Sequence, residues 1–122
     1  MSDCYCDFDP ADFYFASHRK ARKRYDCYEC AGFIAPGEAY EYVFASWDGH
    51  RHEMRTCERC YDLRMWVQNS VPCFCFAHGG LDETADQAID DAIWRAPEET
   101  VGLRFGYLRR KVMRDKFNER AR

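Results

Sequence analysis

Eight cysteines stand in a chain of 122 residues, and they occur as four close pairs: Cys4/Cys6, Cys27/Cys30, Cys57/Cys60 and Cys73/Cys75. The first residues lack the basic and apolar stretches of a secretory signal, so we expect a cytoplasmic protein whose thiols stay reduced. Closely spaced cysteines in a reducing compartment more often hold a metal than form disulfides. The pattern therefore predicts bound Zn²⁺, and disulfides or free core thiols are the alternatives.

The pairs Cys27/Cys30 and Cys57/Cys60 have the Cys-x-x-Cys spacing that presents two thiolates to one zinc ion. Between them, residues 39–47 are rich in strand formers, Asp48-Gly49 is a hairpin turn signal, and residues 51–56 can return as the partner strand. Residues 57–68 have helical periodicity. Turn, hairpin and helix in this order resemble a treble-clef zinc finger. Four cysteine ligands leave no open coordination position, so the predicted site is structural rather than catalytic.

The remaining pairs, Cys4/Cys6 and Cys73/Cys75, predict a second zinc site that clamps the N-terminal segment to the loop after the finger helix. His78 follows Cys75 by three residues and is a possible substitute ligand. The alternatives are buried thiols beside Phe74 and a hydrogen-bonded turn histidine.

The sequence is 47% hydrophobic and 32% charged, which excludes a disordered chain. No apolar run approaches the ~18 residues of a membrane span. We expect a single domain, residues 1–122, of the α+β class. It comprises a zinc-organised part (residues 1–80) built on a treble-clef-like finger and a helical part (residues 81–122) with two helices.

The first C-terminal helix is expected over about residues 81–96, with an acidic outer face. The second is expected over about residues 98–119. Its predicted apolar stripe consists of Val101, Phe105, Leu108, Val112 and Phe117. Gly102 and Gly106 lie inside this second helix and either allow another element to pack closely or are simply tolerated there.

The formal net charge is −3, and eight thiolates with two zinc ions would bring it to −7 (−3 − 8 + 4). A net-acidic chain is a poor general binder of nucleic acid. Two basic segments are nevertheless candidates for binding a partner, either an acidic protein or nucleic acid; their residues are Arg19, Lys20, Arg22, Lys23, Arg24, Arg109, Arg110, Lys111 and Arg114. The alternative is that the second basic segment pairs with the acidic helix before it.

The motifs of zinc enzymes are incomplete. A His-Asn-His nuclease would need a histidine on the finger helix, and residues 58–70 contain none. The deaminase pattern His-x-Glu with Pro-Cys-x-x-Cys is not met by His52-Glu53 and Pro72-Cys73-Phe-Cys75. We therefore predict that the protein is not an enzyme and has no small-molecule substrate.

Several short motifs resemble a family of small, cysteine-rich, zinc-binding phage and prophage proteins of unknown function. They include Cys4-Tyr-Cys6, Cys27-Tyr-Glu-Cys30, Trp47-Asp-Gly49, Arg55-Thr-Cys57 and Cys73-Phe-Cys75-x-x-His78-Gly-Gly, within residues 4–80. The resemblance implies a phage-type accessory protein in the cytoplasm of a bacterial host. Its predicted role is to bind, and so inhibit, a host or defence protein such as a CRISPR effector. The alternative is a nucleic-acid-binding transcriptional regulator.

Overall fold

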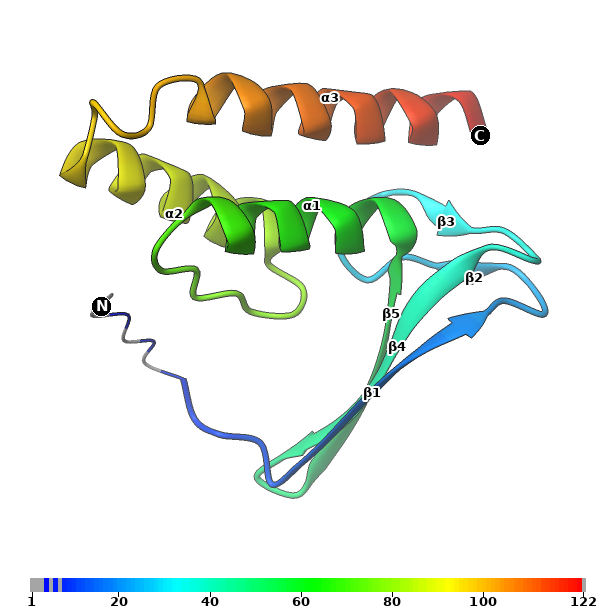
Figure 1. Ribbon diagram of the computed structural model, residues 1–122. Helices are drawn as coiled ribbons and strands as arrows, with labels where there is room; N and C mark the ends of the chain where they lie inside the picture. Colours follow the sequence, from blue (N-terminus) through cyan, green and yellow to red (C-terminus); the bar gives the residue numbers. More distant parts are fainter. Residues whose placement is uncertain (1–3, 5, 7, 122) are drawn as a thin grey trace.

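The central feature of the computed structural model, which describes residues 4, 6 and 8–121, is a long β-hairpin (Figure 1). β4 (Ala39–Trp47) pairs antiparallel with β5 (His50–Cys57). Asp48 and Gly49 connect the strands with φ angles of 51° and 79°. A type I′ turn requires left-handed backbone at both central residues, and Asp-Gly supplies it at little cost. The predicted hairpin is confirmed.

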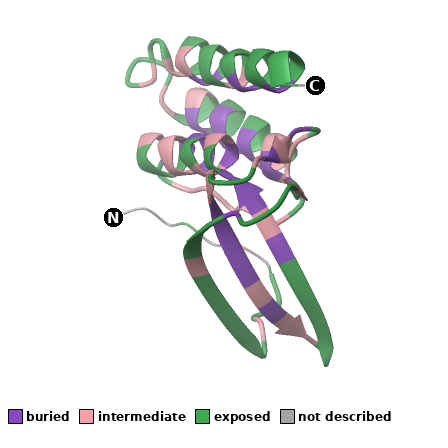
Figure 2. Cartoon of the chain, turned by 90° about the vertical axis from the view of Figure 1, so that its right-hand side faces the viewer, coloured by how far each residue is buried: buried purple, intermediate pink, exposed green. Residues whose placement is uncertain are grey.

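β1 (Phe13–Lys20) pairs antiparallel with the other edge of β4, giving the strand order β1-β4-β5. The basic residues Arg19 and Lys20 thus end an edge strand. Burial is concentrated in the central strand, as Figure 2 shows, whereas most of β1 is exposed.

A second, small hairpin joins β2 (Tyr25–Asp26) to β3 (Phe33–Ile34). Its loop contains Cys27 and Cys30, and the N–H of Cys27 donates to the carbonyl of Gly32. An added Cβ at Gly32 would lie 2.3 Å from the Asn118 side-chain oxygen. This glycine therefore leaves room for a side chain from a distant helix.

α1 (Glu58–Ser70), α2 (Leu81–Arg95) and α3 (Leu103–Ala121) lie together at one end of the hairpin (Figure 1). α1 follows β5 directly. The structure is thus α+β, with a small antiparallel sheet and helices packed at its end. Within the described residues, no helix combines the length and apolar character needed to cross a membrane.

The core lies where the helices meet the end of the sheet at which β5 leads into α1. Fully buried side chains there include Ile34, Val67, Leu81 and Ile89. Val43, Ala45 and Met54 form a separate small cluster farther along the hairpin.

The prediction for α3 needs two corrections. The helix begins at Leu103 rather than near residue 98, because Gly102 has a left-handed φ of 84° that an α-helix does not accommodate. The expected apolar stripe also faces outward: Phe105 is 72% exposed, and Leu108 and Val112 are about half exposed. The buried residues of α3 are instead Tyr107, Arg114 and Asn118.

Gly106 does lie at a close approach between helices. A Cβ added there would come within 3.0 Å of the Trp66 ring on α1.

Candidate metal centres

The first candidate centre gathers the sulfur atoms of Cys27, Cys30, Cys57 and Cys60, which all lie within 4.8 Å of one another. The Cys30 and Cys57 sulfurs are 3.9 Å apart. Four Zn–S bonds of about 2.3 Å in a tetrahedron give sulfur–sulfur distances of about 3.8 Å. The predicted ligand set is therefore brought together at a spacing that fits a tetrahedral metal ion.

Local backbone geometry directs these sulfurs toward one point. Cys57 ends β5 and caps α1, where its sulfur accepts the N–H of Cys60 at 3.4 Å. In the small hairpin, the Cys27 sulfur accepts the N–H groups of Glu29 (3.4 Å) and Cys57 (3.3 Å). The Cys30 sulfur accepts the N–H of Gly32 at 3.4 Å. Such N–H donors stabilise thiolates, which are the form that ligates metal.

The cluster cannot hold four negative charges unaided. Hydrogen bonds from the neighbouring sulfurs lower the pKa of Cys30, whereas contacts with Cys27 and Cys30 raise the pKa values of Cys57 and Cys60. Cys57 and Cys60 therefore favour the protonated thiol, whereas Cys30 favours the thiolate. A divalent cation removes this conflict, because it stabilises all four thiolates at once.

Two side chains of α3 complete the surroundings of this cluster. Asn118 donates its amide N–H to the Cys30 sulfur at 3.3 Å. The Arg114 guanidinium lies 3.7 Å from the Cys60 sulfur and donates to both carboxylate oxygens of Asp82 on α2, at 2.7 and 2.8 Å. A zinc ion with four thiolates carries a net charge of −2, so a cation beside it is favourable. Polar contacts therefore hold α3 against the first cysteine cluster and against Asp82 on α2.

Arg114 is for this reason wrong as a partner-binding residue. It is only 4% exposed, and Asp82 and the finger cluster already occupy its donors. Lys111 also faces inward, 3.9 Å from Asp82 and 3.8 Å from Asp86. Arg114 and Lys111 thus agree with the alternative hypothesis from the sequence, that basic residues of the last helix pair with the acidic helix before it.

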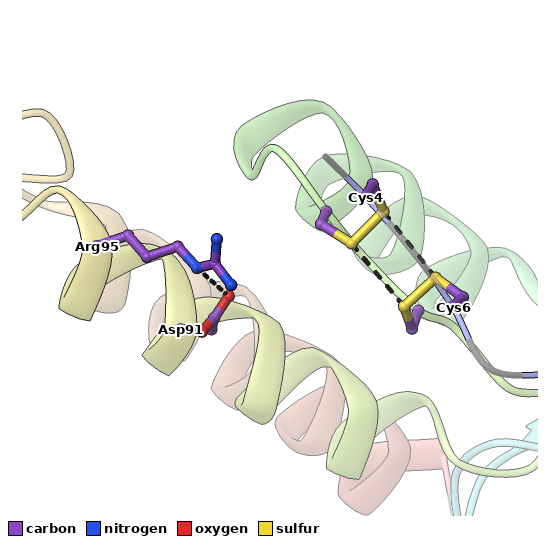
Figure 3. The surroundings of a disulfide bond; sticks show 6 residues. Cys4, Cys6, Asp91 and Arg95 are labelled. Atoms are coloured by element: carbon purple, nitrogen blue, oxygen red, sulfur yellow. Dashed lines mark hydrogen bonds and ion pairs between the residues drawn. A yellow bond between two sulfur atoms is a disulfide. The ribbon is translucent and has the colours of Figure 1, made fainter. Parts of the chain in front are cut away.

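The second candidate centre gathers Cys4, Cys6, Cys73 and Cys75, whose sulfur atoms also lie within 4.8 Å of one another. Figure 3 shows the sulfurs joined in two disulfides, Cys4–Cys73 and Cys6–Cys75. The cross-pair distances, Cys4 to Cys6 and Cys73 to Cys75, are 3.9 Å. The predicted set of residues is thus assembled. In this oxidised form it clamps the N-terminal segment covalently, and in the reduced form it could hold a metal ion.

His78 lies apart from the ligand atoms of both clusters. Its Nε2 and the Tyr14 hydroxyl are hydrogen-bonded at 2.8 Å, and its ring packs edge-on against Phe76. Its Nδ1 is 3.9 Å from the buried carboxylate of Glu29. Burial, with the nearby Arg64 charge, lowers the pKa of His78.

Glu29 connects the loop of the small β2–β3 hairpin to α2, a role that the sequence alone did not indicate. Its carboxylate accepts the N–H groups of Gly79 (3.0 and 2.9 Å) and Leu81 (3.1 Å) at the start of the helix. The helix has no side-chain cap of its own at Gly80. A carboxylate between Cys27 and Cys30 thus supplies the missing cap from a distance in sequence that no local motif reveals.

The first basic segment remains at the surface. Arg19 stacks on Tyr42 and Arg24 on Phe33 at about 4 Å. Arg19, Lys20 and Arg22 line a hollow of about 540 Å³ with Tyr25 and Tyr40. On α3, Arg109 and Lys116 form no ion pair with any described residue, and Arg110 stacks on Trp66.

Comparison of the chain with protein-family models, with curated proteins and with solved structures finds no match. Its function is therefore argued from its own residues.

Proposed function

We propose that this chain is a non-enzymatic, zinc-stabilised binding protein of the phage type, which binds and inhibits a host or defence protein in the bacterial cytoplasm. In this proposal the first cysteine cluster holds a structural Zn²⁺, and β2–β3, β4–β5 and α1 act as a treble-clef-like finger. The reduced second cluster holds another zinc ion. The finger serves as a scaffold that presents α3.

The outward face of α3 carries the proposal. Phe105, Leu108 and Val112 recur at positions i, i+3 and i+7 and are largely exposed. This is the spacing with which a helix inserts its apolar anchors into a groove of another protein. A helix that buries its polar side and exposes its apolar side is inverted relative to an ordinary surface helix, so the exposed side is suited to a partner.

The charges at the edge of this face indicate what that partner offers. Arg109 directly follows Leu108, and Lys116 lies one helical turn beyond Val112; neither forms an ion pair with a described residue. The partner surface is therefore an apolar groove with an acidic rim. A second copy of the chain would bring like charges together, which is unfavourable.

Site-specific photo-crosslinking from residue 108 in a host lysate tests the proposal. We expect one protein to be crosslinked from position 108 and not from position 53, a control at the exposed side of the hairpin. Val112→Asp should abolish the product crosslinked from position 108, while Glu53→Gln should leave it unchanged. Equal yields from both positions, or no product from position 108, would count against the proposal.

Nucleic-acid binding is the second candidate, favoured by the basic and aromatic hollow of Arg19, Lys20 and Arg22. It predicts binding that weakens steeply as salt rises, and loss of binding in the Lys20→Glu/Arg22→Glu double variant. No anisotropy change with labelled DNA or RNA at about 50 mM salt would exclude this candidate.

A further inference from the structure

A cavity of about 630 Å³ lies on the side of the hairpin that faces the N-terminal segment. Its walls come from residues 8–11, from β1, from the hairpin and from the loop before α2. Five aromatic rings line it, those of Phe8, Tyr14, Tyr28, Trp47 and Phe76. This volume is typical of ligand pockets, which are mostly apolar with few polar groups. The described lining residues include no cysteine and no residue of α3.

Asp9 is the acidic residue among the described lining residues, which also include His52 and His78 but no lysine or arginine, although the chain has 18 of them. Arg64 lies behind the Phe76 ring and is paired with Glu41. His78 Nε2 is hydrogen-bonded to the Tyr14 hydroxyl. Burial lowers the pKa of His78, which disfavours the charged form of its ring.

Aromatic faces attract cations because the π-electrons carry partial negative charge, and cages of such rings bind quaternary ammonium groups. We propose that this cavity binds an organic cation with an alkylated ammonium head group, held by the rings of Tyr14 and Trp47 and by Asp9. Asp9 would repel an anion, and an uncharged ligand would gain no electrostatic attraction from it.

The wall that carries Phe8 and Asp9 is held in place by specific contacts. The Trp47 indole N–H donates to the Asp9 carbonyl at 3.2 Å, and the Asp12 N–H donates to the Ser46 carbonyl at 2.8 Å. The second cysteine cluster fixes the same segment at Cys4 and Cys6. The N-terminal clamp thereby gains a role, because it closes one side of a binding site.

Choline and its uncharged isostere 3,3-dimethylbutan-1-ol make a matched pair of probes. Both are titrated into the ¹⁵N-labelled full chain while the Trp47 indole N–H signal, assigned with Trp47→Phe, is followed. We expect saturable shifts with choline and affinity at least about fivefold weaker for the isostere, in the range of cation–π interactions. Equal affinities for the two probes, or no saturable shift with choline, would overturn the proposal.

Variants of one ring separate cation binding from packing. Tyr14→Phe keeps the aromatic face and should retain choline affinity within about twofold, whereas Tyr14→Leu should weaken it about fivefold or more. Asp9→Asn should weaken choline binding without affecting the isostere. Circular dichroism establishes that each variant is folded. Undiminished choline binding by folded Tyr14→Leu would contradict the assignment.

Discussion

Arg114 is the residue on which the attachment of α3 depends most directly. It is buried, it pairs with both oxygens of Asp82, and it lies beside the Cys60 sulfur. Tyr107, also on α3, adds a hydrogen bond to Asp86, which lies on α2 like Asp82. A single arginine therefore connects the finger, α2 and α3.

Arg114→Met should lower the free energy of unfolding by about 2–4 kcal/mol, because it removes the hydrogen bonds of the buried guanidinium to Asp82 and to the Cys60 sulfur. Arg109→Met on the outward face of the same helix is the matched control, and we expect a change within about 0.5 kcal/mol. Urea unfolding measures both. Equal effects of the two substitutions would contradict the polar attachment of α3.

His78 makes stability depend on pH. Its pKa in the folded protein is below the ordinary value of 6.5, first because of burial and then because of Arg64. Just below pH 6.5 the unfolded chain therefore binds a proton that the folded chain does not. This contribution to stability is fully present above pH 6.5 and is lost as the pH falls below it.

We expect the stability difference between the native chain and His78→Gln to shrink as the pH falls from 7.5 to 5.5. Tyr14, Glu29 and Phe76 face the imidazole and are present in both proteins. Urea unfolding at several pH values gives the difference. An NMR titration that places the His78 pKa at or above 6.5 would refute the expectation.

At the scale of elements, the sequence predicts those parts whose cause is local. The I′ turn at Asp48-Gly49, the two strands beside it and α1 all follow from turn chemistry and periodicity. α2 likewise runs from Leu81 to Arg95, close to the range expected. Cys27, Cys30, Cys57 and Cys60 come together because the β4–β5 hairpin brings the chain back to the β2–β3 loop.

The orientation of α3 could not be predicted from its periodicity. Taken alone, the apolar periodicity of Phe105, Leu108 and Val112 predicts that this face of α3 is buried. The finger cluster instead attracts the donors of Arg114 and Asn118, which lie on the opposite side of the helix. A sulfur cluster assembled by residues more than fifty positions away thus decides which face packs. The aromatic cavity escaped prediction for the same reason, since distant segments build it.

Gly102 determines where α3 starts. With a φ of 84° and nothing within 4 Å of an added Cβ, substitution there strains the backbone without a steric clash. Gly102→Ala should therefore cost about 1 kcal/mol of stability, measured by urea unfolding. Gly80→Ala is the control, because Gly80 has a negative φ of −128° and only ordinary contacts. A stabilised Gly102→Ala variant would show that the helix can begin earlier.

At the scale of the whole molecule, the two cysteine clusters have different tasks. The first lies where β5, α1 and α3 meet, so its loss removes contacts from most of the fold. The second ties the N-terminal segment to the loop after α1 (Figure 3). The molecule is thus organised around the finger cluster, with a clamp that acts on one segment.

The Cys4→Ser/Cys6→Ser variant should release the N-terminal segment and leave the finger intact. Hydrogen exchange should show faster exchange at residues 8–12 and unchanged protection in β4 and α1. Cys60→Ser should instead remove protection from the finger and from α3, since a structural zinc site can contribute about 10 kcal/mol or more in zinc-finger peptides. A loss of only a few tenths of a kcal/mol in Cys60→Ser would be incompatible with a structural metal there.

Zinc content measured by native mass spectrometry under reducing conditions tests the central claim most directly. We expect two zinc ions in the native chain, one in Cys4→Ser/Cys6→Ser, and loss of the zinc of the first cluster in Cys60→Ser. A folded native chain that carries no metal and retains free thiols at Cys27, Cys30, Cys57 and Cys60 would contradict it.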